Sequence, residues 1–134
     1  MIVGTGIDLV DIRRIQSTLE TYGQRFIDRL FCPSEVEFCL RRPDQAAAFA
    51  RHYAVKEAAC KALGTGMTQG VAWRGIELYR EKGRKPELVF HQGALKRLNT
   101  LLPAQTKPRL HVSISDEPPY ATAIVIIEAL PDQI

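Results

Sequence analysis

Apolar and polar residues follow two patterns along the chain, one with the period of a strand and one with the period of a helix. Residues 2–10 have the strand period. The spacing of apolar residues then predicts five helices: one through Ile12, Ile15 and Leu19, a short one through Phe26, Ile27 and Leu30, one at residues 33–42, a long one from about Gln45 to Leu63, and a short one at residues 92–102. Asp11 and Asp44 directly precede two of these helices and can cap them.

The strand period returns after Gly66. It predicts strands at residues 75–80, 85–90, 109–115 and 120–130, with turns at residues 81–84 and 116–119. The last of these strands is apolar on both faces, so we expect both faces to be buried. One strand, then helices, then mostly strands is the order of an α+β fold. No linker or repeat divides the chain, which predicts a single domain over residues 1–134.

Composition narrows the class of protein. Apolar residues make up 46% of the 134 residues, enough for a core, but no apolar run approaches the ~20 residues that span a bilayer. The N-terminus lacks the features of a signal peptide. Three cysteines, Cys32, Cys39 and Cys60, form no Cys-x-x-Cys pair, which favours free thiols. We therefore predict a cytoplasmic protein. The net charge of +3 permits an acidic partner but requires neither nucleic acid nor a membrane.

The long predicted helix carries two charged residues on an unusual face. Phe49, Tyr53, Glu57 and Lys61 recur every four residues and form one row, beside a row of alanines that allows close packing. Glu57 and Lys61 fit either an ordinary ion pair on the helix surface or a functional site. The alanine-rich flank favours the functional interpretation, because charges beside a close-packed face are less freely hydrated.

Three further places could contribute to a site. Asp8 follows Gly4 and Gly6 in the first strand; it either faces solvent or, with a second acid such as Glu57, holds a hard cation such as Mg²⁺. The segment at residues 64–66 follows a helix, so it is no P-loop, and it serves either as a helix terminator or as flexible backbone that lines a ligand. His111 in the strand RLHVSIS fits an ordinary surface histidine.

These motifs together resemble a known family. GIDLVDIRRI, FARHYAVKEAACKALGTG, GRKPEL and HVSIS occur in the order seen in bacterial holo-acyl-carrier-protein synthases, which are 4′-phosphopantetheinyl transferases. The resemblance covers nearly the whole chain. It implies a mainly antiparallel sheet wrapped around one long helix, and a homotrimer with the nucleotide between subunits. It also implies transfer of phosphopantetheine from coenzyme A to a serine of an apo-acyl carrier protein, which releases adenosine 3′,5′-bisphosphate and supports fatty acid biosynthesis.

The resemblance assigns roles to the acids and the lysine. Asp8 and Glu57 would hold Mg²⁺ against the coenzyme A diphosphate. Lys61 would contact the phosphates and steady the leaving oxygen. Glu57 is also the candidate base for the serine proton, directly or through water.

Coenzyme A would meet residues from two chains. The resemblance implies these contacts: Lys61, Gly64 and Thr65 from one chain, and Lys85, Pro86 and His111 from its neighbour. His52 stands where the family commonly has an arginine near the 3′-phosphate of coenzyme A. We therefore expect either His52 to hold that phosphate weakly or Arg51, Arg42 or Arg41 to compensate. Tyr53 stands where the family more often has Phe or Trp.

The resemblance also implies that an acidic carrier protein docks on the first helices. The candidate residues are Arg13, Arg14, Arg25, Phe26 and Arg29. Acidic residues occur in the same region, so only a one-sided arrangement of the arginines would form a basic surface. Two alternatives stay open: a non-catalytic trimeric module that binds acidic proteins, and a metal-dependent hydrolase of nucleotide diphosphates.

Overall fold

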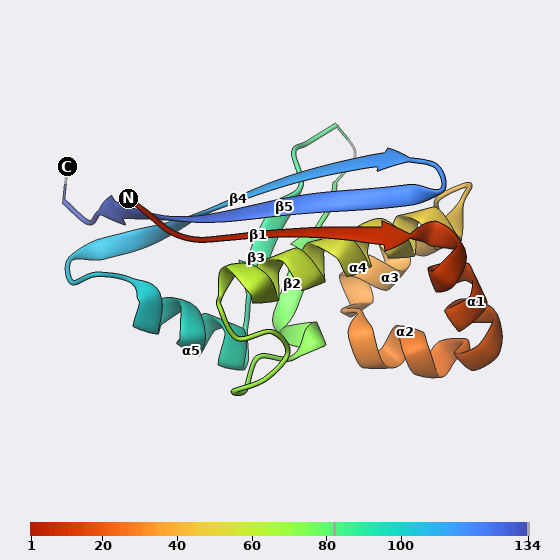
Figure 1. Ribbon diagram of the computed structural model, residues 1–134, viewed down its shortest axis with the longest axis horizontal. Helices are drawn as coiled ribbons and strands as arrows, with labels where there is room; N and C mark the ends of the chain where they lie inside the picture. The colour runs from red at the N-terminus through yellow and green to blue at the C-terminus, as the bar shows by residue number, and fades with distance from the viewer. Residues whose placement is uncertain (82, 134) are drawn as a thin grey trace.

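The computed structural model describes residues 1–81 and 83–133, so Lys82 of the predicted turn at 81–84 lies outside the described residues. Helices and strands follow in the predicted order (Figure 1). The strands are β1 (Ile2–Asp11), β2 (Ile76–Tyr79), β3 (Glu87–Phe90), β4 (Thr106–Glu117) and β5 (Tyr120–Pro131). The helices are α1 (Ile12–Tyr22), α2 (Gln24–Leu30), α3 (Pro33–Leu40), α4 (Gln45–Ala62) and α5 (Gln92–Leu101), with a short 3₁₀ turn, η1, at Trp73–Gly75.

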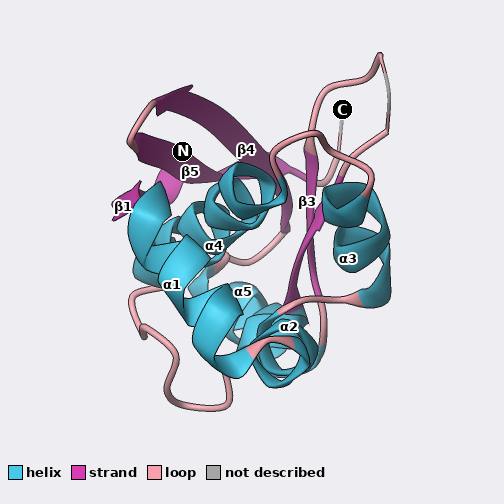
Figure 2. Cartoon of the chain, turned by 90° about the vertical axis from the view of Figure 1, so that its right-hand side faces the viewer, coloured by secondary structure: helices cyan, strands magenta, loops and turns pink. Residues whose placement is uncertain are grey.

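The strands form two antiparallel sheets. The larger sheet has the order β1-β5-β4, and β2 pairs with β3 in a separate ribbon. The long helix α4 lies under the larger sheet, and Figure 2 shows the helices gathered on one side of it. The α+β prediction of an antiparallel sheet around one long helix is confirmed, with the refinement that the predicted strands divide between two sheets.

The predicted helix ends hold to within two residues, and α4 and α5 each end one residue earlier than predicted. The Asp11 side chain accepts a hydrogen bond from the backbone N–H of Arg13, and the Asp44 side chain accepts one from Ala47. The third helix ends at Leu40, two residues earlier than predicted. Cys32, at the start of this helix, is a poor capping residue. The Glu35 side chain caps the helix instead, because it accepts a hydrogen bond of 3.0 Å from the Cys32 N–H.

Close packing between β1 and α4 depends on two glycines, which have no side chain to separate the strand from the helix. A Cβ at Gly4 would collide with the Ala62 carbonyl oxygen, and one at Gly6 would collide with the Ala58 carbonyl oxygen. The backbone of β1 therefore rests directly on the backbone of α4. This explains both the paired glycines and the alanine row of the helix.

Burial of α4 is nearly complete. Phe49 is buried, but the next members of its row, Tyr53, Glu57 and Lys61, are not, and they form one stripe on a helix that is otherwise mostly enclosed. Outside this stripe only Gln45 and Arg51 of the helix escape full burial. The stripe is thus where α4 meets solvent near the edge of β1.

One expectation about burial is wrong for the single chain. The inner face of β5 is buried as predicted, but Ile124 on its outer face remains 39% exposed. Ile124 lies opposite Ile7 of β1, which is 64% exposed, and the neighbouring Leu9 is 66% exposed. The outer face of the larger sheet is therefore an open apolar surface.

No helix within residues 1–81 and 83–133 combines the length and apolar character needed to cross a membrane. The three cysteines are free and buried, as predicted. Burial raises the pKa of the Cys39 thiol to about 12, so this thiol stays protonated at neutral pH.

A group of charged side chains lies inside the core, and the sequence pattern did not predict it. Glu35, His52 and Lys56 are all fully buried. The Lys56 ammonium donates to Glu35 Oε1 at 2.6 Å, to the Trp73 carbonyl at 3.0 Å and to the Ile76 carbonyl. His52 Nδ1 lies 2.8 Å from Glu35 Oε2. This network joins α3, α4 and the start of β2.

The network makes stability depend on pH through His52. Burial lowers the pKa of His52 below 6.5, although its hydrogen bond to Glu35 opposes this shift. Below about pH 6.5 the unfolded chain therefore binds more protons than the folded one, so the free energy of unfolding falls as pH falls. Glu35 affects stability at lower pH than His52. Burial raises the pKa of Glu35, but its hydrogen bond with His52 and the charge of Lys56 outweigh burial and lower that pKa below 4.5.

We expect His52→Gln, which keeps a hydrogen-bond donor for Glu35 but cannot titrate, to remove part of the acid loss of stability. The free energy of unfolding of wild type and variant is measured by urea unfolding between about pH 7 and 5. Subtracting one pH slope from the other removes the contribution of the other titrating groups. The remaining difference in slope can reach about 1.4 kcal/mol per pH unit. Identical slopes in the two proteins would show that His52 has the same proton affinity folded and unfolded.

Candidate active site

Asp8 and Lys61 meet at the edge between β1 and α4. The Lys61 ammonium donates to Asp8 Oδ1 at 3.1 Å and to the Ile7 carbonyl at 3.0 Å. The Asp8 side chain is only 14% exposed, whereas that of Lys61 is 50% exposed. Thr122 of β5 fixes the strand here by donating to the Asp8 carbonyl at 2.8 Å. The strand and the helix therefore place a carboxylate and an ammonium group at one point.

Glu57 belongs to the same cluster. Partial burial raises the pKa of its carboxyl group, and the nearby negative charge of Asp8 raises it further. The charge of Lys61 partly offsets these effects. Two acids distant in sequence thus share one small region. The sequence could not show that they meet.

The donors of this cluster fit a hard divalent cation. Asp8 and Glu57 supply carboxylate oxygens, and their mutual repulsion would be relieved by a positive ion between them. Within the described residues no group of three or more His, Cys, Asp or Glu side chains is placed to hold a metal. A cation here would therefore take its other ligands from water or from a substrate, as Mg²⁺ commonly does.

The segment after α4 continues this cluster. Gly64 has a φ of 78°, which favours glycine, and its N–H donates to the Lys61 carbonyl at 3.0 Å. The N–H of Thr65 donates to the Cys60 carbonyl at 3.3 Å. Gly64 is exposed and Thr65 half-buried, and both follow α4 within three residues of its end at Ala62.

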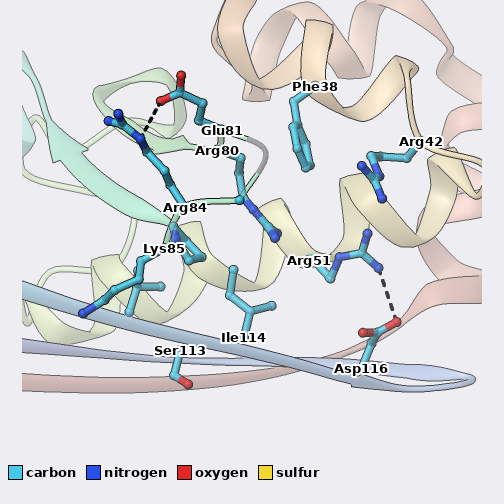
Figure 3. Close-up of a pocket in the computed structure, with 13 residues that line it drawn as sticks. Phe38, Arg42, Arg51, Arg80, Glu81, Arg84, Lys85, Ser113, Ile114 and Asp116 are labelled. Carbon is cyan, nitrogen blue, oxygen red and sulfur yellow. Dashed lines mark hydrogen bonds and ion pairs between the residues drawn. The ribbon is translucent and has the colours of Figure 1, made fainter.

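A second site is a cationic cavity of about 800 Å³ on another part of the surface (Figure 3). It is lined by Phe38, Arg42, Arg51, Arg80, Glu81, Gly83, Arg84, Lys85, Pro86, Val112, Ser113, Ile114 and Asp116. Figure 3 shows the guanidinium groups of Arg42, Arg51 and Arg80 pointing into the same space. Burial and the charges of Arg51 and Arg42 lower the pKa of Arg80, as expected where cations crowd together.

The arginines of this cavity are held in place. The guanidinium carbons of Arg42 and Arg80 lie 5.3 and 5.0 Å from the Phe38 ring centroid. Arg51 is anchored by Asp116 at 3.3 Å. Cations fixed in this way are chemically suited to the phosphate groups of a ligand. Sequence analysis named Lys85, Pro86, Arg42 and Arg51 but missed Arg80 and Phe38.

His52 does not belong to this site, and the expectation that it holds a phosphate is wrong for this structure. Its side chain is fully buried and its Nδ1 is engaged by Glu35. The next residue along the helix, Arg51, lines the cavity instead. Of the suggested replacements Arg51 and Arg42 are present there, whereas Arg41 forms a surface ion pair with Glu37 at 2.7 Å.

The other expected nucleotide contacts lie apart from the acidic cluster. Lys85 and Pro86 line the cationic cavity, which includes none of Asp8, Glu57 and Lys61. His111 lies on the exposed face of β4, where its Nε2 is 3.0 Å from Glu128 Oε1. One chain therefore does not bring these two groups of residues together.

Most of the arginines predicted to contact a partner gather at one place. A hollow of about 500 Å³ is lined by Thr18, Tyr22, Arg25, Phe26, Arg29, Leu30, Tyr53 and Trp73. Arg14 reaches the rim, because its Nη2 donates to the Tyr53 hydroxyl at 3.1 Å. Arg13 differs, since it is held by the Asp11 carboxylate at 2.7 Å.

The neighbouring acids lie elsewhere. Asp28 and Glu37 line a separate hollow with Pro33 and Arg74. The arginines are therefore grouped on one side, away from these acids. Such a grouping is what a basic docking surface requires. Tyr53 belongs both to the arginine-lined hollow and to the stripe that carries Glu57, so the hollow adjoins the acidic cluster. Sequence analysis did not foresee this link.

Comparison with known proteins gives a consistent answer. Residues 4–124 match the family model described as the 4′-phosphopantetheinyl transferase superfamily. A holo-[acyl-carrier-protein] synthase of Methylobacterium radiotolerans is 53% identical over 131 residues, covering 98% of this chain and 96% of the relative. One from Brucella ovis is 48% identical and covers 98% of both chains.

Solved structures agree with the sequence relatives. The crystal structure of holo-[acyl-carrier-protein] synthase from Neisseria meningitidis matches with a TM-score of 0.83 and 31% identity, covering 96% of this chain and 99% of that one. The Helicobacter pylori synthase in complex with coenzyme A matches with a TM-score of 0.77 and 25% identity, covering 92% and 99%. The chain therefore belongs to the 4′-phosphopantetheinyl transferase superfamily, among the holo-[acyl-carrier-protein] synthases.

Proposed function

We propose that this enzyme transfers 4′-phosphopantetheine from coenzyme A to a serine of an apo-acyl carrier protein, depends on Mg²⁺ and supports fatty acid biosynthesis. The serine oxygen forms a bond to the phosphorus that carries pantetheine. The bond from that phosphorus to the bridging oxygen breaks, and adenosine 3′,5′-bisphosphate leaves with this oxygen. The observation that carries the proposal is the cluster of Asp8, Glu57 and Lys61 on the open stripe of an otherwise enclosed helix.

Asp8 and Glu57 are the residues that would hold Mg²⁺. When bound, the ion supplies positive charge that neutralises and orients the diphosphate of coenzyme A. The Lys61 ammonium hydrogen-bonds the Asp8 carboxylate and therefore lies beside the proposed cation site. From there it can stabilise negative charge on the leaving oxygen. Half of the Lys61 side chain is exposed, which leaves it free to reach a ligand.

Glu57 is also the proposed acceptor of the serine proton. Burial and the charge of Asp8 raise its pKa, and a carboxylate with a raised pKa is a stronger base than an ordinary one. The arginine-lined hollow adjoins Glu57 through Tyr53. A carrier protein bound there, through its acidic residues on Arg14, Arg25 and Arg29 and an apolar contact on Phe26, would place its serine near this base.

We assign the nucleotide end of coenzyme A to the cationic cavity, with Arg42, Arg51, Arg80 and Lys85 around its phosphates. Because this cavity excludes Asp8 and Glu57, the full ligand would span two copies of the chain. The open outer face of the larger sheet supports such assembly. Ile7 and Leu9 are about two-thirds exposed there, and Ile124 lies beside them. We propose a homotrimer in which His111, on the same face, contacts the neighbouring copy.

We place the reaction in the cytoplasm, since three free buried thiols are typical of a reducing compartment. Residues 1–134 would act as one transferase domain.

The test combines native and intact-mass spectrometry. An apo-acyl carrier protein is incubated with the enzyme, coenzyme A and Mg²⁺, with and without EDTA. We expect the carrier to gain one phosphopantetheine, the gain to vanish with EDTA, and the native enzyme to have three times the 15.0 kDa chain mass. Dephospho-coenzyme A is expected to be a poorer donor, because the cationic cavity would lose one phosphate partner.

Other results would change the proposal in specific ways. Cleavage of coenzyme A without a modified carrier would favour the hydrolase alternative. Full transfer in EDTA would refute the metal dependence, and a monomer with full activity would refute the shared site. Equal use of coenzyme A and its dephospho form would sink the assignment of the 3′-phosphate to the cationic cavity.

A further inference from the structure

The ring of Phe38 holds two of the cations in the cationic cavity. Figure 3 shows this ring between the side chains of Arg42 and Arg80. The guanidinium carbon of Arg80 lies 5.0 Å from the ring centroid, and that of Arg42 lies 5.3 Å from it. An aromatic face attracts a cation at distances up to about 6 Å. One side chain of α3 therefore positions a guanidinium group just beyond the end of its own helix and another just beyond β2.

These two cations keep their charge, unlike their neighbours. The acids of the cavity are paired with other arginines: Glu81 with Arg84 at 3.5 Å and Asp116 with Arg51 at 3.3 Å. Among the described residues, the two guanidinium groups beside the Phe38 ring form no ion pair. An aromatic face carries no net charge, so it attracts a guanidinium group without neutralising it. Their charge therefore stays available for an anion.

The position of the Phe38 ring is set by the buried network. Its centroid lies 5.8 Å from that of the fully buried His52 ring. Glu35, on the same helix as Phe38, accepts a hydrogen bond of 3.4 Å from the backbone N–H of Leu78. This bond ties α3 to β2, the strand that leads directly into Arg80. The ring therefore has a fixed place relative to both cations.

We propose that Phe38 is a positioning residue that presents Arg42 and Arg80 to the 3′-phosphate of coenzyme A and thereby sets the preference for coenzyme A over its dephospho form. The proposal rests on the assignment of the nucleotide end to the cationic cavity. A phosphate monoester carries nearly two negative charges and three acceptor oxygens, so it gains most from unneutralised guanidinium groups held in place. Arg51 contributes less to this preference, because Asp116 already offsets its charge.

Substitutions of Phe38 separate the aromatic face from the space that it fills. Phe38→Leu removes the face, and Phe38→Tyr keeps it. Tyr79→Leu is the matched control, since Tyr79 is 46% exposed, directly precedes Arg80 and does not line the cationic cavity. We expect Phe38→Leu to lower kcat/KM for coenzyme A about tenfold, through KM, and to leave kcat/KM for dephospho-coenzyme A unchanged. Phe38→Tyr and Tyr79→Leu should match the wild type with both donors.

Calorimetric titration provides a second readout that does not depend on transfer. The Kd for adenosine 3′,5′-bisphosphate should rise by a similar factor in Phe38→Leu, whereas the Kd for adenosine 5′-monophosphate should not change. An equal loss of affinity for both nucleotides would overturn the proposal and make the ring a general support of the cavity. An unchanged Kd for the bisphosphate would overturn it as well, because the guanidinium groups would then hold their places without the ring.

Failure of this inference is distinguishable from failure of the proposed function. If Arg80→Gln selectively weakens binding of the bisphosphate and Phe38→Leu does not, only the positioning role is refuted. If the wild type binds both nucleotides with the same Kd, the assignment of the 3′-phosphate to this cavity is wrong, and the role of Phe38 falls with it. Circular dichroism at the assay temperature verifies that each variant is folded. Phe38→Met, which fills the space with a flexible chain, makes the same test if Phe38→Leu does not fold.

Discussion

Glu57→Gln and Asp8→Asn are each expected to lower the kcat for phosphopantetheine transfer by about 10²–10⁴-fold, the usual range for loss of a group that acts on protons or charge in the transition state. Each amide keeps the shape of the acid but removes a negative charge from the proposed cation site. Glu57→Gln also removes the proposed base. The measurement is the rate of carrier modification by intact-mass spectrometry at saturating coenzyme A.

Neither substitution is expected to destabilise the fold. The two acids repel each other, and the Asp8–Lys61 ion pair is half exposed on the lysine side, where such pairs contribute little. Glu87→Gln, at an exposed position at the start of β3, is the matched control and should retain wild-type activity. Wild-type activity in Glu57→Gln or Asp8→Asn would refute the proposed site. A large drop in thermal midpoint would instead mean that the acids support the fold.

Lys56→Met is expected to cause the largest loss of stability, about 3–5 kcal/mol in the free energy of unfolding, because it leaves the buried Glu35 carboxylate without its cation. Methionine resembles the lysine stem in volume, so little of the loss would come from a cavity. Two backbone carbonyls, those of Trp73 and Ile76, would also lose their donor. Urea unfolding at pH 7 measures the effect.

A paired substitution tests the cause. Glu35→Gln combined with Lys56→Met removes both charges, so we expect the double variant to be more stable than Lys56→Met alone. If the double variant were instead as unstable as the sum of both single variants, the loss would come from packing or backbone contacts. Lys96→Met, on an exposed position of α5, controls for the loss of a lysine as such.

The fold could be predicted well where periodicity and caps agree. Asp11, Asp44 and the glycines around residue 64 mark helix ends by local chemistry, and local chemistry is visible in a sequence. The division of strands between two sheets was not visible, because pairing between β2 and β3 and among β1, β5 and β4 depends on contacts distant in sequence. The outer face of β5 was misjudged for a related reason: an apolar face is buried only when something covers it.

The candidate site was partly predictable. Asp8, Glu57 and Lys61 were named from their spacing and from a family resemblance, and the structure brings them together. His52 was misplaced because a motif position does not state which way a side chain points. Adjacent positions on α4 point in different directions, so Arg51 lines the cationic cavity whereas His52 lies in the core. Glu35 and Lys56, the other members of the buried network, carry charges that a hydropathy pattern assigns to the surface, so the sequence pattern gave no sign of the network.

The glycines of β1 have a further consequence for how this enzyme can vary. Because Gly4 and Gly6 let two main chains touch, the separation between Asp8 and the acid across from it is set by backbone atoms that no side-chain exchange can adjust. Two residues without a functional group, Gly4 and Gly6, thus set the distance between the two acids of the site. Substitutions at these glycines should lower activity as strongly as substitutions of the acids, although neither glycine takes part in the chemistry.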